Sequence, residues 1–290
     1  MKYSMKEFYV IIFQAVLISV IILSQTAFGH EEGAPFSGAI IDPLDVHHAH
    51  IEDEQRINFS FLDGFRDEEG EKRTAYSTSL ELAVDWTGKF RLGSEVVIPF
   101  SNTGSDRNVY NIGDIELWPI KYAFIKKPET ILTGVLSFGL PTGDESKGLG
   151  EGNTTAGALI LIDHAYRNWF FGFNTEIATN LSNKAGSEFE VASVISYSFI
   201  KETGNGMAPT RPHQAIVPSL SLEIISKSGL SGEEKGEDPV NVIGGFTLWH
   251  TKSGWTGRIG VDVPMRSDRE SDLSVLFQIG NHISWGKLFR

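Results

Sequence analysis

The 290-residue chain contains no cysteine. This absence excludes a disulfide framework, thiolate catalysis, and zinc or iron–sulfur sites built on cysteine. The sequence also has no long apolar run after residue 24, so it excludes a helical membrane protein apart from an N-terminal anchor. Positive charge is scarce, with 25 Lys and Arg against 37 Asp and Glu and a net charge of −12. The acidic balance argues against a nucleic-acid partner.

Residues 1–29 have the organisation of a secretory signal peptide. Lys2 and Lys6 form a positive start, residues 8–23 are apolar, and Ala27-Phe28-Gly29 is a small-residue cleavage pattern. An uncleaved helical anchor is the alternative. We expect cleavage after Gly29 and export of the rest of the chain.

From Arg56 onward the sequence alternates between apolar and polar residues. In residues 76–86, Tyr, Thr, Leu and Val side chains occupy one parity and Ser, Glu and Asp the other, which predicts β-strands with two unlike faces. Most of the predicted strands have ten to fourteen residues, whereas soluble strands average about five or six and tilted membrane strands need about nine to eleven. Twelve strands are expected, at 56–66, 75–86, 89–100, 113–125, 130–141, 154–165, 168–180, 187–200, 215–227, 239–250, 254–265 and 272–285.

The predicted connections differ by position in the chain. The odd-numbered ones are long and polar, and the even-numbered ones, such as Thr87-Gly88, are tight. This asymmetry is typical of bacterial outer-membrane barrels, with short periplasmic turns and longer outer loops. The eighth connection, 201–214, is the exception because it is long. The fourth strand alternates poorly, which predicts a bulge near Pro119.

Aromatic residues gather beside the tight turns and predict an interfacial girdle. The residues concerned are Trp86, Phe90, Tyr166, Trp169, Tyr197, Phe199, Trp249 and Trp255.

The polar faces of the strands carry charge, which is costly to bury in a soluble core but is solvated in a barrel lumen. With the register above, eight acids and two arginines line the lumen, which favours cations over anions. A slip of one residue would reverse the faces. The predicted lumen residues are Glu81, Asp85, Arg91, Glu95, Glu116, Glu176, Glu190, Glu223, Arg258 and Asp262.

Residues 30–55 form a pre-barrel segment that is rich in histidine and acids and does not alternate. His30, His47, His48 and His50 are candidate ligands for Cu or Zn, because imidazole and carboxylate suit these metals. His48 and His50 would share a face in an extended strand, and His47 and His50 would share one in a helix. Cleavage after Gly29 would add a free amine at His30. The alternative is a solvated segment without metal. The segment could also plug the barrel.

The middle of the chain resembles a known family. GDIELWPIKYAFI (113–125), LTGVLSFGLPTGD (132–144) and GLGEGNTTAG (148–157) resemble the outer-membrane β-barrel family named for the meta-pathway of phenol degradation. The resemblance implies a barrel of this size and passage of small, often aromatic or hydrophobic, compounds. It supplies no catalytic residues.

These observations predict an all-β protein: a transmembrane antiparallel up-and-down β-barrel of about twelve strands over 56–290. We expect a passive channel in the outer membrane of a Gram-negative cell, in contact with lipid and passing small molecules or cations. A metal-handling barrel and a soluble secreted β-sandwich are the alternatives. An enzyme is not expected, since no G-x-S-x-G elbow or Ser/His/Asp constellation is found.

Overall fold

The computed structural model describes residues 36–66, 72–101, 110–147, 149–181, 186–202, 207–232, 235–236, 238–266 and 271–282. The signal-peptide prediction, His30 and residues 283–290 lie outside these ranges. The strands are β1 (Glu54–Arg66), β2 (Lys72–Asp85), β3 (Leu92–Ser101), β4 (Asn111–Ile112), β5 (Ile115–Lys126), β6 (Thr130–Leu140), β7 (Thr155–Tyr166), β8 (Trp169–Asn180), β9 (Ser187–Ser198), β10 (Ile216–Ser231), β11 (Val240–His250), β12 (Trp255–Pro264) and β13 (Leu273–His282).

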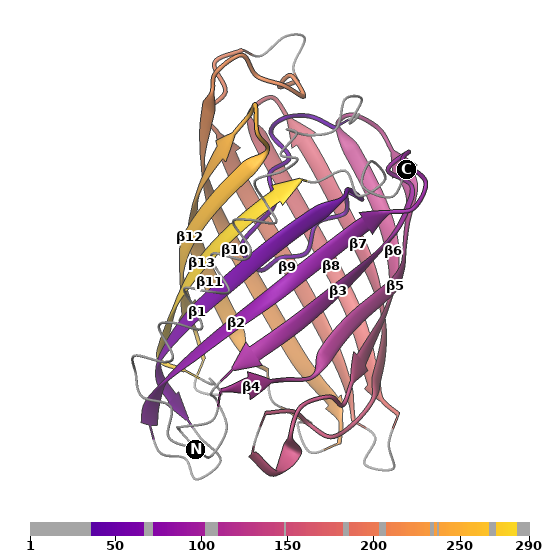
Figure 1. Ribbon diagram of the computed structural model, residues 1–290, viewed down its shortest axis with the longest axis vertical. Coiled ribbons are helices and arrows are strands. Elements are labelled where there is room, and N and C mark those ends of the chain that lie inside the picture. The colour runs from indigo at the N-terminus through magenta and orange to yellow at the C-terminus, as the bar shows by residue number, and fades with distance from the viewer. Residues whose placement is uncertain are drawn as a thin grey trace.

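Twelve of these strands form a closed antiparallel barrel (Figure 1). Each long strand pairs with its neighbours in chain order, and β1 closes the ring by pairing with β13 from Glu54 opposite His282 to Asp63 opposite Leu273. The two-residue β4 adds to the end of β3 and is not part of the ring. The predicted up-and-down barrel is therefore confirmed, and a single ring replaces the two packed sheets of the β-sandwich alternative.

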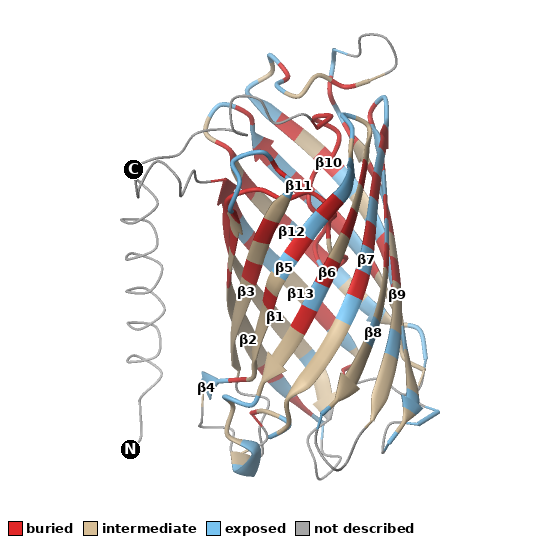
Figure 2. Cartoon of the chain, turned by 90° about the vertical axis from the view of Figure 1, so that its right-hand side faces the viewer, coloured by how far each residue is buried: buried red, intermediate tan, exposed pale blue. Residues whose placement is uncertain are grey.

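The side chains alternate between an apolar outer face and an inner face that mixes apolar and polar residues, as strand β7 illustrates. Leu159, Leu161 and Asp163 are buried inside the barrel, whereas Ile160 and Ile162 are exposed on its outer face. Figure 2 shows the same banding on neighbouring strands. An apolar exterior around a polar interior is the arrangement of a transmembrane barrel. Among the described residues, the one helix is the 3-10 turn Glu145–Lys147, and no helix is long and apolar enough to cross a membrane.

The predicted bulge near Pro119 is present in β5. The pairing of β5 with β6 shifts register between Leu117 and Ile120, and its pairing with β3 shifts at the same place. The extra residue changes which parity faces inward, because the inward set passes from Trp118 to Lys121 and Ala123. Lys121 therefore enters the lumen, where simple alternation from Trp118 would have placed it outside.

The turn between β2 and β3 is longer than expected. It spans residues 86–91, so the prediction that a strand begins at residue 89 was wrong. Phe90 has a positive φ of 53°. Its ring packs against the ring of Phe36, with the two centroids 5.7 Å apart, so Phe90 lies inside the barrel and not in the aromatic girdle. Arg91 also lies in this turn, and its guanidinium donates to the Ala123 carbonyl at 3.0 Å.

Most other members of the predicted girdle lie on the outer face. Trp86, Tyr166 and Trp169 are exposed, and Phe199 is exposed beside Tyr197. Trp249 is an exception, because it is 1% exposed and shares its inward parity with Ile243 and Thr247 of β11. The prediction that Trp249 belongs to the girdle was therefore wrong.

The connections between strands distinguish the two rims of the barrel. We call the rim with residues 86–91, 127–129, 167–168, 199–215 and 251–254 the turn end, and the opposite rim the loop end. The long connection 199–215 lies at the turn end, as the expected exception to the rule. Its Ala208 carbonyl accepts a hydrogen bond from Ser37 Oγ at 3.3 Å, so this connection contacts the pre-barrel segment at Ser37.

Candidate functional site: the barrel lumen and an inner segment

Residues 36–53, here called the inner segment, lie inside the barrel near the turn end (Figure 1). Nearly all of these residues are buried, and Asp45 is the one exposed position in the segment. The segment has no regular secondary structure of its own, so its backbone groups need partners from the strands around it. Those partners include charged side chains of the inner barrel wall.

Two barrel carboxylates accept hydrogen bonds from the backbone of the inner segment. Glu223 of β10 accepts from the amides of Leu44, Asp45 and Val46 at 2.8, 3.0 and 2.9 Å. Asp163 of β7 accepts from the Ala49 amide at 2.8 Å. Hydrogen bonds to an ionised acceptor are stronger than neutral ones. These contacts explain why both carboxylates are fully buried.

Glycines of the barrel wall leave room for the apolar side chains of the inner segment. Leu44 lies against Gly245 of β11 and Gly260 of β12, and a Cβ added at Gly245 would lie 2.6 Å from Leu44 Cδ1. A Cβ at Gly260 would overlap the same methyl group. The inner segment therefore fits a groove that larger residues would fill.

The substitution Gly260→Val is expected to displace the inner segment and leave the barrel intact. Overpacking of this kind costs about 1–3 kcal/mol, and the segment can move away more easily than the strand. Limited proteolysis of the purified protein measures the effect. We expect faster cleavage within residues 36–53 in the variant than in the wild type. Gly257→Val is the control, because Gly257 lies in the same strand and a Cβ added there would have no atom within 4 Å. Equal cleavage of the two variants would contradict the packing argument.

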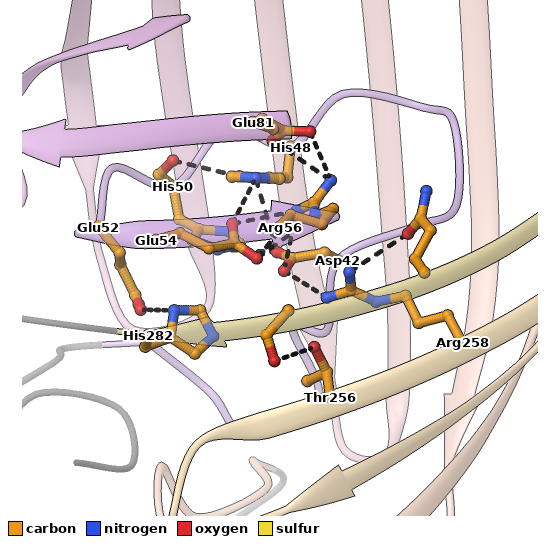
Figure 3. Close-up of polar contacts among 12 residues, drawn as sticks. Asp42, His48, His50, Glu52, Glu54, Arg56, Glu81, Thr256, Arg258 and His282 are labelled. Atoms are coloured by element: carbon orange, nitrogen blue, oxygen red, sulfur yellow. Dashed lines mark hydrogen bonds and ion pairs between the residues drawn. The ribbon is translucent and has the colours of Figure 1, made fainter. Parts of the chain in front are cut away.

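An ion-pair network joins the inner segment to β1, β2 and β12 (Figure 3). Asp42 Oδ2 lies 2.6 Å from Arg258 Nη2 and 3.2 Å from Arg56 Nη2. Arg56 also pairs with Glu54 at 3.0 Å and Glu81 at 3.4 Å. The geometry is that of a buried polar network, in which removing one partner leaves another charge unpaired.

Two of the predicted histidines join this network and one does not. The rings of His48 and His50 stack with centroids 3.9 Å apart. Asp42 Oδ1 lies 2.9 Å from His50 Nε2 and 3.7 Å from His48 Nε2. His47 instead packs edge-on against Trp118 at 4.5 Å.

The two stacked histidines differ in charge. Burial by itself lowers the pKa of His50, but the nearby Asp42 and Asp163 carboxylates outweigh it and raise this pKa to about 10. The pKa of His48 falls well below its usual value, because the ring is buried and lies beside His50. At neutral pH the ring of His50 therefore carries a positive charge, and the neutral ring of His48 stacks against it.

Beyond the inner segment, towards the loop end, the lumen contains a cavity of about 280 Å³. Glu81 and Glu95 line it together with Lys121, whose Nζ lies 2.7 Å from Glu95 Oε2. His47 and His48 reach the same cavity from the inner segment. The cavity is thus mixed in charge on this side of the barrel.

A second lumen cavity, of about 310 Å³, is strongly acidic. Within the described part of the chain, Lys227 is the one basic residue in its lining, and its Nζ lies 3.4 Å from Glu190 Oε2. Like charges that line a water-filled passage attract the opposite ion. The carboxylates of its lining are Asp114, Glu116, Glu151, Glu176, Glu188 and Glu190.

The predicted lumen residues fall into four groups in the structure. Glu81, Glu95, Glu116, Glu176 and Glu190 line the two cavities, and Glu223 and Arg258 bind the inner segment. Asp262 accepts a hydrogen bond from Asn241 at 3.0 Å. Asp85 and Arg91 have turn roles, since Asp85 accepts from the Thr87 and Phe90 amides at 3.0 and 2.7 Å.

Sequence reasoning missed several charged residues of the lumen. Lys121 was hidden by the bulge, whereas Arg56, Asp163 and Lys227 have the inward parity of their strands. Parity within each strand could have identified these three residues. Arg56 faces the same side as Asn58, Asp163 the same side as Leu161, and Lys227 the same side as Glu223.

A closed twelve-stranded barrel with an apolar outside is the architecture of outer-membrane β-barrel proteins. No family model matches the sequence, and no curated protein matches it. Among solved structures, the chain is similar to the COG4313 outer membrane channel from Pseudomonas putida F1, with a TM-score of 0.53 and 12% identity over 83% of this chain and 99% of that one. It is also similar to the NanC porin, with a TM-score of 0.51 and 11% identity over 79% and 99% of the two chains. At this identity the likeness establishes the shared fold.

Proposed function

We propose that the protein is a passive outer-membrane channel for small molecules that favours cations. The acidic cavity carries this proposal, because six carboxylates and one lysine line it. The two solved structures named above are a channel and a porin, which favours transport over catalysis, and the exterior of this barrel suits lipid. The resemblance of residues 113–157 to the meta-pathway family supports small, often aromatic, substrates and stays a prediction.

The inner segment has a role in this proposal as a plug at the turn end. It occupies the lumen between the acidic cavity and that rim, and its docking depends on Glu223, Asp163 and the Asp42 network. We assign the turn end to the periplasm, since short turns lie there in outer-membrane barrels. The loop end then faces outward, so the acidic cavity lies on the outer side of the inner segment.

Ion selectivity in a planar bilayer tests the proposed function. With a KCl gradient across the membrane, the zero-current potential of the purified protein is expected to have the sign of a K⁺-preferring pore. Replacing Glu116, Glu176 and Glu190 together by Gln should move that potential towards zero, because three charges are lost from the acidic cavity. Glu202→Gln is the control, since Glu202 is solvent-exposed in a turn and pairs with His213. An anion-preferring wild-type pore would contradict the proposal.

A further inference from the structure

We propose that Asp42, His48 and His50 form a binding site for one divalent transition-metal ion of the zinc class, with Glu54 as a fourth donor. The site joins the inner segment to the first residue of β1. It goes beyond the channel function and does not rest on it, because a metal could bind here whether or not solutes pass.

The donor atoms already have the spacing of a small coordination sphere. One potential ligand atom from each of Asp42, His48 and His50 lies within 4.8 Å of the others. Two of these separations are 2.9 Å, from His50 Nε2 to Asp42 Oδ1, and 3.7 Å, from His48 Nε2 to the same oxygen. Glu54 Oε2 lies 3.7 Å from His48 Nε2. Bonds of about 2.0–2.2 Å in a tetrahedral zinc site put ligand atoms about 3.3–3.6 Å apart, so small movements would complete the geometry.

The surrounding contacts orient the ligand atoms. His48 Nδ1 donates to the His50 carbonyl at 3.2 Å, which leaves the lone pair on Nε2. Metal-bound histidines commonly make such a bond through the second ring nitrogen. Asp42 Oδ2 is held by Arg258, whereas Oδ1 faces the Nε2 atoms of both His50 and His48. The Oδ1 atom therefore points to the place where a metal ion would bind.

Negatively charged side chains outnumber guanidinium groups in this network. Four carboxylates, on Asp42, Glu54, Glu81 and Asp163, stand beside the two guanidiniums of Arg56 and Arg258. Carboxylates thus outnumber guanidiniums in this buried place, where a bound divalent cation would offset part of their negative charge.

The donor set and its access favour a transition metal. Imidazole with carboxylate suits Zn, Cu and Ni, whereas Ca²⁺ and Mg²⁺ prefer oxygen ligands alone. His48 and Glu81 also line the 280 Å³ lumen cavity, which gives an ion a route to the site. The alternative is a purely structural network in which the histidines only anchor the inner segment, and it predicts no saturable metal binding.

Titration calorimetry of the chelator-treated full chain in detergent with Zn²⁺ tests the proposal. We expect one Zn²⁺ per chain, and we expect His48→Gln to weaken binding by at least about 10- to 100-fold, the range found even for outer partners of metal ligands. His47→Gln is the matched control, because His47 lies in the same segment but packs on Trp118 away from the donor set. Absence of Zn²⁺ binding, or equal affinity of the His48→Gln variant and the wild type, would overturn the site.

A second measurement separates loss of the site from loss of folding. Each variant is checked for heat-modifiable migration on a gel, which reports the closed barrel. The wild type is then titrated with Co²⁺, which absorbs visible light strongly when it is four-coordinate. We expect this absorption in the wild type and its displacement by Zn²⁺. A weak spectrum of the hydrated ion would overturn the proposal even if the variants failed to fold.

Discussion

Deleting residues 36–53 is expected to raise the single-channel conductance of the protein severalfold. In the intact chain these residues fill the lumen near the turn end, where they bind Glu223 of β10, Asp163 of β7 and Arg258 of β12. Without them the barrel wall meets water, and its buried charges become solvated instead of unpaired. The barrel itself closes through the β1–β13 pairing, which the deletion leaves in place. Planar-bilayer recording of the deletion variant measures the effect.

The control for this deletion replaces residues 36–53 by a flexible Gly/Ser linker of equal length. The linker keeps the chain length and removes every side chain that docks. Both variants are expected to show the same high conductance and the same heat-modifiable migration. An unchanged conductance in both would show that the inner segment does not obstruct passage.

The second large effect is expected from Glu223→Gln. The Glu223 carboxylate accepts hydrogen bonds from three successive residues of the inner segment, Leu44 to Val46. A neutral amide keeps one acceptor oxygen and presents an NH₂ group to the other amides, so at least one buried N–H loses its acceptor. Hydrogen bonds to charged groups contribute about 1.5–3 kcal/mol each. A loss of about 3 kcal/mol would raise the undocked fraction of the segment on the order of 100-fold.

Hydrogen exchange of the Leu44–Val46 amides measures that fraction, and conductance should rise with it. Glu190→Gln is the matched control: it removes the same charge from the lumen wall, where Glu190 pairs with Lys227 and not with the inner segment. Faster exchange in the Glu223 variant alone supports docking through this carboxylate. Equal exchange in the two variants would assign the effect to lumen charge in general.

The barrel could be predicted from the sequence because the strand period is local. Alternation within each segment placed most strand ends within two or three residues, as for the strand expected at 130–141 and found at Thr130–Leu140. In β7 to β12 the inward-facing residues follow this alternation. Position beside a turn was a poorer guide, because it does not indicate which face of the strand an aromatic residue occupies. Trp249 has the same parity as the inward-facing Thr247, and this parity places it inside the barrel.

The site was less accessible to sequence reasoning. The bulge in β5 reverses the parity after Pro119, and this hid the Lys121–Glu95 pair. The inner segment has no periodicity, so its contacts depend on the closed barrel; Asp42 meets Arg258 across 216 residues of chain. The rings of His48 and His50 stack in a segment that has no regular secondary structure, so neither strand nor helix spacing accounts for their contact. Their partners Asp42 and Asp163 could not be deduced from that spacing.

The most direct test of the proposed channel uses a reversible tether between the inner segment and the barrel wall. Leu44 contacts Gly260, so cysteines at both positions bring two sulfurs together, and the chain has no cysteine of its own. In a chain that also carries Glu223→Gln, we predict high single-channel conductance when the pair is reduced and low conductance when it is oxidised. The same conductance in both states, with the disulfide shown to form, would contradict the claim that docking of the inner segment restricts passage through the channel.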